Sequence, residues 1–209
     1  MQAHNFDVDI LIPSSQQKVK INKESISVNQ STIACADVKA IKYGVSLIGG
    51  KKNPDRKEYH IGIQSIHDVE ISIDFKSDKV QELLAEDHTY YYIMSGLWQY
   101  VKKQLINQFI DALNQKDSFQ IGEAIITHEG ILMSYKTWFL RKVKTTLVPW
   151  SDIKYFLKKG ILNIKSTENS RQKIQLSLHN DWNAVVLNTL LHYLWQEKRK
   201  EKLAKGQSI

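Results

Sequence analysis

The chain has 209 residues, of which 42% are hydrophobic and 24% are charged, and this ordinary globular composition excludes disorder over most of its length. Its longest apolar runs fall far short of the roughly 20 residues that a membrane-spanning helix needs, and its first residues lack the basic and apolar regions of an export signal. The single cysteine, Cys35, excludes an internal disulfide, so we expect a cytoplasmic protein in which this thiol is a small buried hydrophobe.

Positive charge is concentrated in one half of the chain, whose overall net charge is +7. Residues 1–115 contain 13 Lys and Arg against 14 Asp and Glu, whereas residues 116–209 contain 16 against 8, so the two parts carry −1 and +8. This excess predicts an anionic partner for the second half: lipid head groups, nucleic acid or an acidic protein.

A pattern near the start of the chain returns in the second half. Residues 21–28 (INKESISV) and 126–133 (ITHEGILM) share the order Ile, two residues, Glu, one residue, Ile, one residue and an apolar residue. Residues 37–41 (DVKAI) and 152–156 (DIKYF) then repeat Asp, an apolar residue and Lys. Landmarks that recur in the same order indicate an internal repeat.

Each copy continues with a strand and a helix. Segments 71–75 (ISIDF) and 174–178 (IQLSL) alternate apolar and polar residues, which predicts half-buried strands. Segments 92–115 and 181–196 place apolar residues at four-residue spacing, which predicts amphipathic helices, and Asp181 is expected to be the N-cap of the second. Because an apolar stripe must be buried, each helix is expected to cover an open end or face of its sheet.

These elements predict a mainly β protein with α-helices, divided into two domains of similar design. We place the first domain at residues 1–116 and the second at residues 117–197, with the boundary in the polar stretch 114–120. Residues 198–209 form a charged C-terminal tail, which is expected to be the fraying, solvated end of the last helix.

The second half has the more specific order of segments: a strand region, a basic hairpin, PWSDI, a KKGILNI hairpin, a further strand and a closing amphipathic helix. This order resembles the bacterial pleckstrin-homology-like (PH-like) and GRAM-type domains over residues 120–196, and less closely over 18–113. The resemblance implies two bent β-sandwich or barrel domains in tandem, each closed by its C-terminal helix, with Trp150 and Ile153 in the core of the second. The first copy departs from it in having ACAD in place of PWSD and an acidic insertion, 79–92, before its helix.

Sequence patterns of catalysis and metal binding are weak. The seven histidines show no His-x-x-x-His spacing and the lone cysteine allows no Cys-x-x-Cys pair, so no zinc site is predicted. No Gly-x-Ser-x-Gly elbow occurs, and the glycines of residues 44–52 precede a segment that cannot open a helix as a phosphate-binding loop requires. Trp150 and Asp152 suggest an active-site pair, but the first copy keeps only the Asp. We therefore predict no enzyme, no metal and no cofactor.

The strongest candidate for partner binding is the hairpin 135–144 (YKTWFLRKVK). Trp138 and its two apolar neighbours cannot all face the core of a strand, so one side chain is expected in solvent beside Arg141, Lys142 and Lys144. A twisted hairpin with a solvated basic face is the structural alternative. Further basic residues on neighbouring hairpins extend the predicted patch: Lys158, Lys159, Lys165, Arg171 and Lys173.

Three functions remain open for this patch. The first is a non-enzymatic binding or adaptor protein that recognises an anionic membrane surface or a protein partner through the basic face of the second domain, in the cytoplasm or peripherally on the inner membrane face. The alternative is nucleic-acid binding through the same basic and aromatic hairpin. A structural scaffold, in which the domains pack into a rigid unit or a homodimer, fits the same residues.

Overall fold

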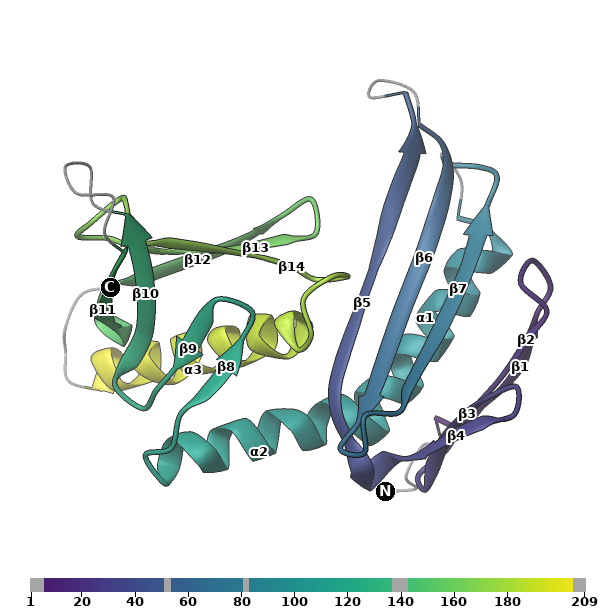
Figure 1. The fold of residues 1–209 in the computed structure, drawn as a ribbon, viewed down its shortest axis with the longest axis horizontal. Helices are drawn as coiled ribbons and strands as arrows, with labels where there is room; N and C mark the ends of the chain where they lie inside the picture. The colour runs from purple at the N-terminus through teal and green to yellow at the C-terminus, as the bar shows by residue number, and fades with distance from the viewer. Residues whose placement is uncertain (1–5, 51–53, 81–82, 137–142, 205–209) are drawn as a thin grey trace. The chain divides into compact units, whose positions relative to one another are not determined.

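The structure, a computed structural model (Figure 1), describes residues 6–50, 54–80, 83–136 and 143–204. The chain forms two compact units, residues 1–105 and 106–209, here called the first and second unit. The predicted domain boundary between residues 116 and 117 follows a long helix, whereas the two units divide within that helix. Antiparallel sheets make up most of the described elements, so the fold is mainly β with α, as predicted.

The first unit begins with a four-stranded antiparallel sheet whose strands follow one another in chain order. They are β1 (Val8–Ile12), β2 (Gln17–Ile21), β3 (Ser25–Val28) and β4 (Ser31–Ala34). Strict alternation explains these strands, because Val19 and Ile21 on β2 and Ile26 and Val28 on β3 are buried while the residues between them are not.

A 3₁₀ turn at Cys35–Asp37 leads into a three-stranded antiparallel sheet. Its strands are β5 (Val38–Gly49), β6 (Pro54–Ser65) and β7 (Glu70–Ser77). β7 alternates without exception, which confirms the predicted strand at 71–75. Cys35 is buried, as expected, and this burial raises the pKa of its thiol to about 11.

One continuous helical segment follows: α1 (Ala85–Leu97), a π-helical turn (Trp98–Lys102) and α2 (Lys103–Asn114). The helix predicted over 92–115 is confirmed at its end but begins earlier, so the later part of the stretch 79–92 forms its first turns. The predicted insertion before the helix was therefore wrong for these residues. The four-residue spacing of Leu97, Val101 and Leu105 does mark the buried stripe of the first unit.

The second unit also begins with four antiparallel strands. They are β8 (Phe119–Ile121), β9 (Ala124–Ile126), β10 (Gly130–Lys136) and β11 (Val143–Pro149), adjacent in chain order. β10 begins at a glycine because no side chain fits there: a Cβ on Gly130 would lie 2.0 Å from the carbonyl oxygen of Val148 on β11.

A 3₁₀ turn at Trp150–Asp152 leads into the second sheet of this unit. The sheet contains β12 (Ile153–Lys158), β13 (Ile161–Ser166) and β14 (Lys173–Ser177), and the unit closes with α3 (Ala184–Ala204). The predicted strand at 174–178 and helix at 181–196 are confirmed. The predicted N-cap role of Asp181 was wrong, because its carboxylate accepts the backbone N–H of Ser177 at 2.6 Å and α3 begins only at Ala184.

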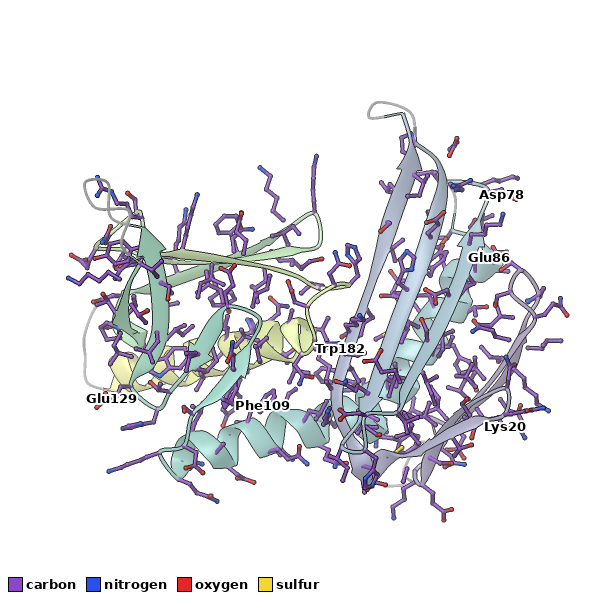
Figure 2. All side chains as sticks on the ribbon, viewed as in Figure 1. Lys20, Asp78, Glu86, Phe109, Glu129 and Trp182 are labelled. Atoms are coloured by element: carbon purple, nitrogen blue, oxygen red, sulfur yellow. The ribbon has the colours of Figure 1, made fainter. Side chains whose placement is uncertain are left out.

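The core of the second unit is formed by both of its sheets and α3, and α3 runs along one face of β12–β14 (Figure 1). Trp150 and Ile153 are half-buried and pack against this core, and the Trp150 indole N–H donates to the His128 carbonyl oxygen at 3.0 Å. The end of α2 contributes too, since Phe109 (labelled in Figure 2) stacks on Phe119 with their ring centroids 4.3 Å apart. The buried members from the sheet and α3 include Leu162, Ile164, Ile174, Leu176, Ala184, Leu187, Leu190 and Leu191.

The two units share one order of elements: a four-stranded sheet, a 3₁₀ turn, a three-stranded sheet and a helix. The repeated aspartates, Asp37 and Asp152, are the last residues of the two turns. Within the residues that the structure describes, no helix is both long enough and apolar enough to cross a membrane.

Candidate anion-binding surface

The sheet β12–β14 has one covered face and one outward face. Residues of one parity, such as Leu162, Ile164 and Leu176, are buried beneath α3. Residues of the other parity point away from the helix, and Figure 2 shows side chains standing off this side of the sheet. We call these nine outward residues the lysine face: Lys154, Phe156, Lys158, Ile161, Asn163, Lys165, Lys173, Gln175 and Ser177.

Three lysines form a row across the lysine face. Lys154 on β12 is directly opposite Lys165 on β13, and Lys165 is directly opposite Lys173 on β14. All three are exposed. Like charges that are directly opposite on neighbouring strands repel each other, so the lysine row lowers the stability of the sheet slightly.

The rest of the lysine face contains no acidic side chain that could offset this charge. Beside the lysine row, Phe156 is opposite Asn163, which in turn is opposite Gln175 and accepts a hydrogen bond from its amide at 2.7 Å. The Lys165 Nζ lies 5.0 Å from the centroid of the Phe156 ring, a cation–π contact. The nine side chains thus combine four lysines with one exposed aromatic ring and no carboxylate.

A shallow cavity of about 450 Å³ adjoins the lysine face along β12, which is an edge strand of its sheet. Lys154, Phe156 and Lys165 line it from the sheet, and His192 lines it from α3. Tyr155 also lines the cavity, and partial burial raises the pKa of its hydroxyl. The cavity is therefore bordered by two of the three lysines in the row.

The structure brings together only some of the residues predicted as a site. Lys158 and Lys159 lie at the β12–β13 turn, where Lys159 (φ 51°) and Gly160 (φ 72°) both adopt the left-handed conformation of a tight two-residue hairpin turn. Lys144 is exposed on β11, opposite Tyr135, and belongs to the other sheet. The remaining predicted residues, Trp138, Arg141 and Lys142, lie outside the described residues.

Sequence reasoning identified Lys165 and Lys173 as an extension of the patch but missed Lys154. The signal was present, because Lys154, Phe156 and Lys158 have the same parity on β12 and must share one side of the strand. The alignment of Lys154 with Lys165 depends on the register of the hairpin, which the tight turn at Lys159 and Gly160 fixes.

The charge row leads to a stability prediction. Replacing Lys173 by Glu turns a repulsive pair with Lys165 into an attractive one, so we expect the free energy of unfolding to rise by about 0.5–1 kcal/mol at low salt. Urea denaturation at low and high salt measures this, and the gain should shrink as salt screens the charges. The matched control is Lys76→Glu on β7, opposite Glu58, which should lower stability. A decrease for Lys173→Glu would contradict the repulsion.

The chemistry that the lysine face offers is binding of anions. Ammonium groups donate charged hydrogen bonds to phosphate and carboxylate oxygens. Among the described ranges, no three His, Cys, Asp or Glu side chains are grouped as the ligands of a metal ion would be. No protein-family model, curated protein or solved structure matches the chain.

Proposed function

We propose that the chain is a non-enzymatic binding protein built of two PH-like units, and that the second unit binds an anionic membrane surface through its lysine face. The observation that carries this proposal is the row formed by Lys154, Lys165 and Lys173 on a sheet face without a carboxylate. The PH-like part of the proposal is supported by the order of a four-stranded sheet, a three-stranded sheet and a closing helix in each unit.

Exposed apolar side chains beside the lysines favour a membrane over other anionic partners. Phe156, on the lysine face, is 42% exposed. Leu157, on the other side of β12 next to the hairpin turn at Lys159, is 49% exposed. An apolar side chain can enter the head-group layer while neighbouring lysines meet anionic lipid. We therefore expect the protein to be cytoplasmic and to associate peripherally with the inner membrane face.

Co-sedimentation with vesicles tests the proposed function. Native protein should sediment with vesicles that contain phosphatidylserine, and not with neutral phosphatidylcholine vesicles. Each lysine near an anionic surface contributes about 1 kcal/mol, so changing Lys154, Lys165 and Lys173 together to Gln should lower the partition coefficient on the order of 100-fold. The matched control changes three exposed lysines of the first unit to Gln, with the same loss of charge: Lys18, Lys23 and Lys76.

Three results would contradict this function. Equal losses for both triple variants would show that only net charge matters and would remove the lysine face as the site. Absence of vesicle binding, together with a gel shift of duplex DNA or RNA whose affinity falls steeply with salt, would establish nucleic-acid binding in its place. Absence of both would leave an acidic protein as the partner of the same face.

A further inference from the structure

A second candidate site lies in the first unit, in a cavity of about 520 Å³ that we call the aromatic cleft. Five aromatic rings line it: Phe6, Tyr43 on β5, Tyr90 and Tyr91 on α1, and Trp98 in the π turn. Tyr91 and Trp98 are also among the exposed large apolar side chains of the chain. Such a cleft offers flat surfaces on which a planar ligand can stack.

The helix is irregular where it borders this cleft. At the π turn, the backbone N–H of Lys103 donates to the carbonyl oxygen of Trp98, five residues earlier, instead of to the residue four earlier. Single π turns of this kind are rare within α-helices and frequently occur at functional sites. The π turn runs from Trp98 to Lys102. Trp98 and Gln99 line the cleft from it, and Lys102 lies against the Trp98 ring.

Lys102 places a positive charge behind the wall of the cleft. Its side chain is almost wholly enclosed, with the residue only 6% exposed. The Nζ donates to the Tyr43 hydroxyl at 2.7 Å and lies 5.1 Å from the centroid of the Trp98 ring and 5.3 Å from that of Tyr43. Both of these rings line the cleft, so only the Tyr43 and Trp98 side chains separate the ammonium group from the cavity.

No counter-charge for Lys102 exists in the described part of the chain, where the Tyr43 hydroxyl is the acceptor it uses. Burial of this amine without a carboxylate lowers its pKa to about 8. Lys57, a partly buried lysine of the same unit, shows the usual arrangement, because its Nζ lies 2.8 Å from a carboxylate oxygen of Asp87. A buried cation is normally paired, and Lys102 is paired only with a neutral hydroxyl.

We propose that the aromatic cleft binds a small planar carboxylate, whose ring stacks against Trp98 and whose negative charge is attracted by Lys102, directly behind the Tyr43 and Trp98 rings. Lys103, which is exposed and lines the same cleft, supplies a second positive charge at its rim. The ligand class follows from the two features together: aromatic walls favour a flat apolar body, and the unmatched ammonium group favours one negative charge. This site lies in the first unit and does not depend on the lysine face.

Calorimetric titration with 2-naphthoate tests this proposal on the full chain, with 2-naphthamide as the neutral ligand of the same shape. Native protein should bind the carboxylate at least 10-fold more tightly than the amide. Lys102→Met, which removes the charge and keeps a flexible unbranched side chain, should abolish this preference, whereas Lys76→Met at an exposed position on β7 should not. Trp98→Leu should weaken both ligands.

Three outcomes would overturn the proposal. They are absence of binding of 2-naphthoate to native protein at millimolar concentration, equal affinity for the carboxylate and the amide, and an undiminished carboxylate preference in Lys102→Met. The comparison of the two ligands uses native protein, so it is decisive whether or not the variants fold.

Discussion

Replacement of Asp87 by alanine is expected to lower the free energy of unfolding by about 3–5 kcal/mol, because it removes a buried carboxylate that pairs with the largely enclosed Lys57 ammonium group. The Asp87 carboxylate accepts hydrogen bonds from the Lys57 ammonium at 2.8 Å, the Tyr59 hydroxyl at 2.8 Å and the backbone N–H of Leu84 at 3.0 Å. Asp87 is only 9% exposed. One side chain therefore ties the start of α1 to β6.

Urea denaturation measures this loss against two comparison variants. Asp87→Asn keeps the shape and part of the hydrogen bonding but removes the charge, so it should be intermediate. Asp9→Ala removes an exposed carboxylate that pairs with Lys20, and should change stability by less than about 1 kcal/mol. Similar small losses for Asp87→Ala and Asp9→Ala would refute the assigned role of Asp87.

The contribution of Asp87 also has a definite pH dependence. Burial by itself raises the pKa of this carboxyl, but the hydrogen bonds from Lys57, Leu84 and Tyr59 outweigh burial and the pKa is lowered from the usual value of 3.8. A lowered folded-state pKa stabilises the fold above pH 3.8, and this stabilisation is lost as the pH falls through the folded-state pKa. The difference in stability between native protein and Asp87→Ala should therefore shrink in acid.

The second effect has the opposite sign: Lys102→Met should make the protein more stable at pH 7. Burial lowers the pKa of the Lys102 amine from 10.5 to about 8, so at pH 7 the fold must hold a charged amine in an apolar setting. At about 1.4 kcal/mol per pKa unit this disfavours the folded state by roughly 3 kcal/mol. Loss of the hydrogen bond to Tyr43 offsets about 1 kcal/mol, and loss of the cation–π contacts with Tyr43 and Trp98 offsets about 1 kcal/mol more, which leaves a net gain of about 1 kcal/mol.

The pH dependence distinguishes this explanation from a general packing effect. Between pH 8 and pH 10.5 the folded protein releases the Lys102 proton before the unfolded chain does, so native stability should rise and the advantage of Lys102→Met should diminish. The Tyr43 hydroxyl beside it does not titrate in this window, because burial raises its pKa to about 12. Thermal unfolding of native protein and Lys102→Met at pH 7 and pH 9.5 measures this difference, and Lys103→Met is the control at an exposed position. If Lys102→Met were less stable than native protein at pH 7, the burial of an unmatched charge would be contradicted.

The elements that sequence could predict are those governed by local periodicity. Strands 71–75 and 174–178 follow from alternation, and the two helices from their four-residue spacing, since one buried face imposes each pattern. Asp181 was misjudged because its carboxylate is used by the turn after β14, and the residue type alone does not reveal which backbone N–H it accepts. Predicting elements was therefore easier than predicting the use of individual polar side chains.

The candidate sites were harder to predict because their key contacts join distant residues. Lys102 meets Tyr43 across 59 positions, and Lys57 meets Asp87 across 30. No local pattern marks a lysine whose neighbours are aromatic rings instead of a carboxylate. The lysine row was partly predictable, since alternation places Lys165 on an outward face, but its alignment required the register of two hairpins.

The helical segment from Ala85 to Asn114 determines where the chain can be cut into fragments. Its residues up to Leu105 belong to the first unit, whereas Phe109 and Leu113 contribute to the core of the second. A recombinant fragment that starts at residue 117 would lack the ring that stacks on Phe119 and would expose the apolar surface that Leu113 covers. Separate expression of the second unit therefore requires the last turns of α2, and a cut at the polar linker would divide a core instead of separating two domains.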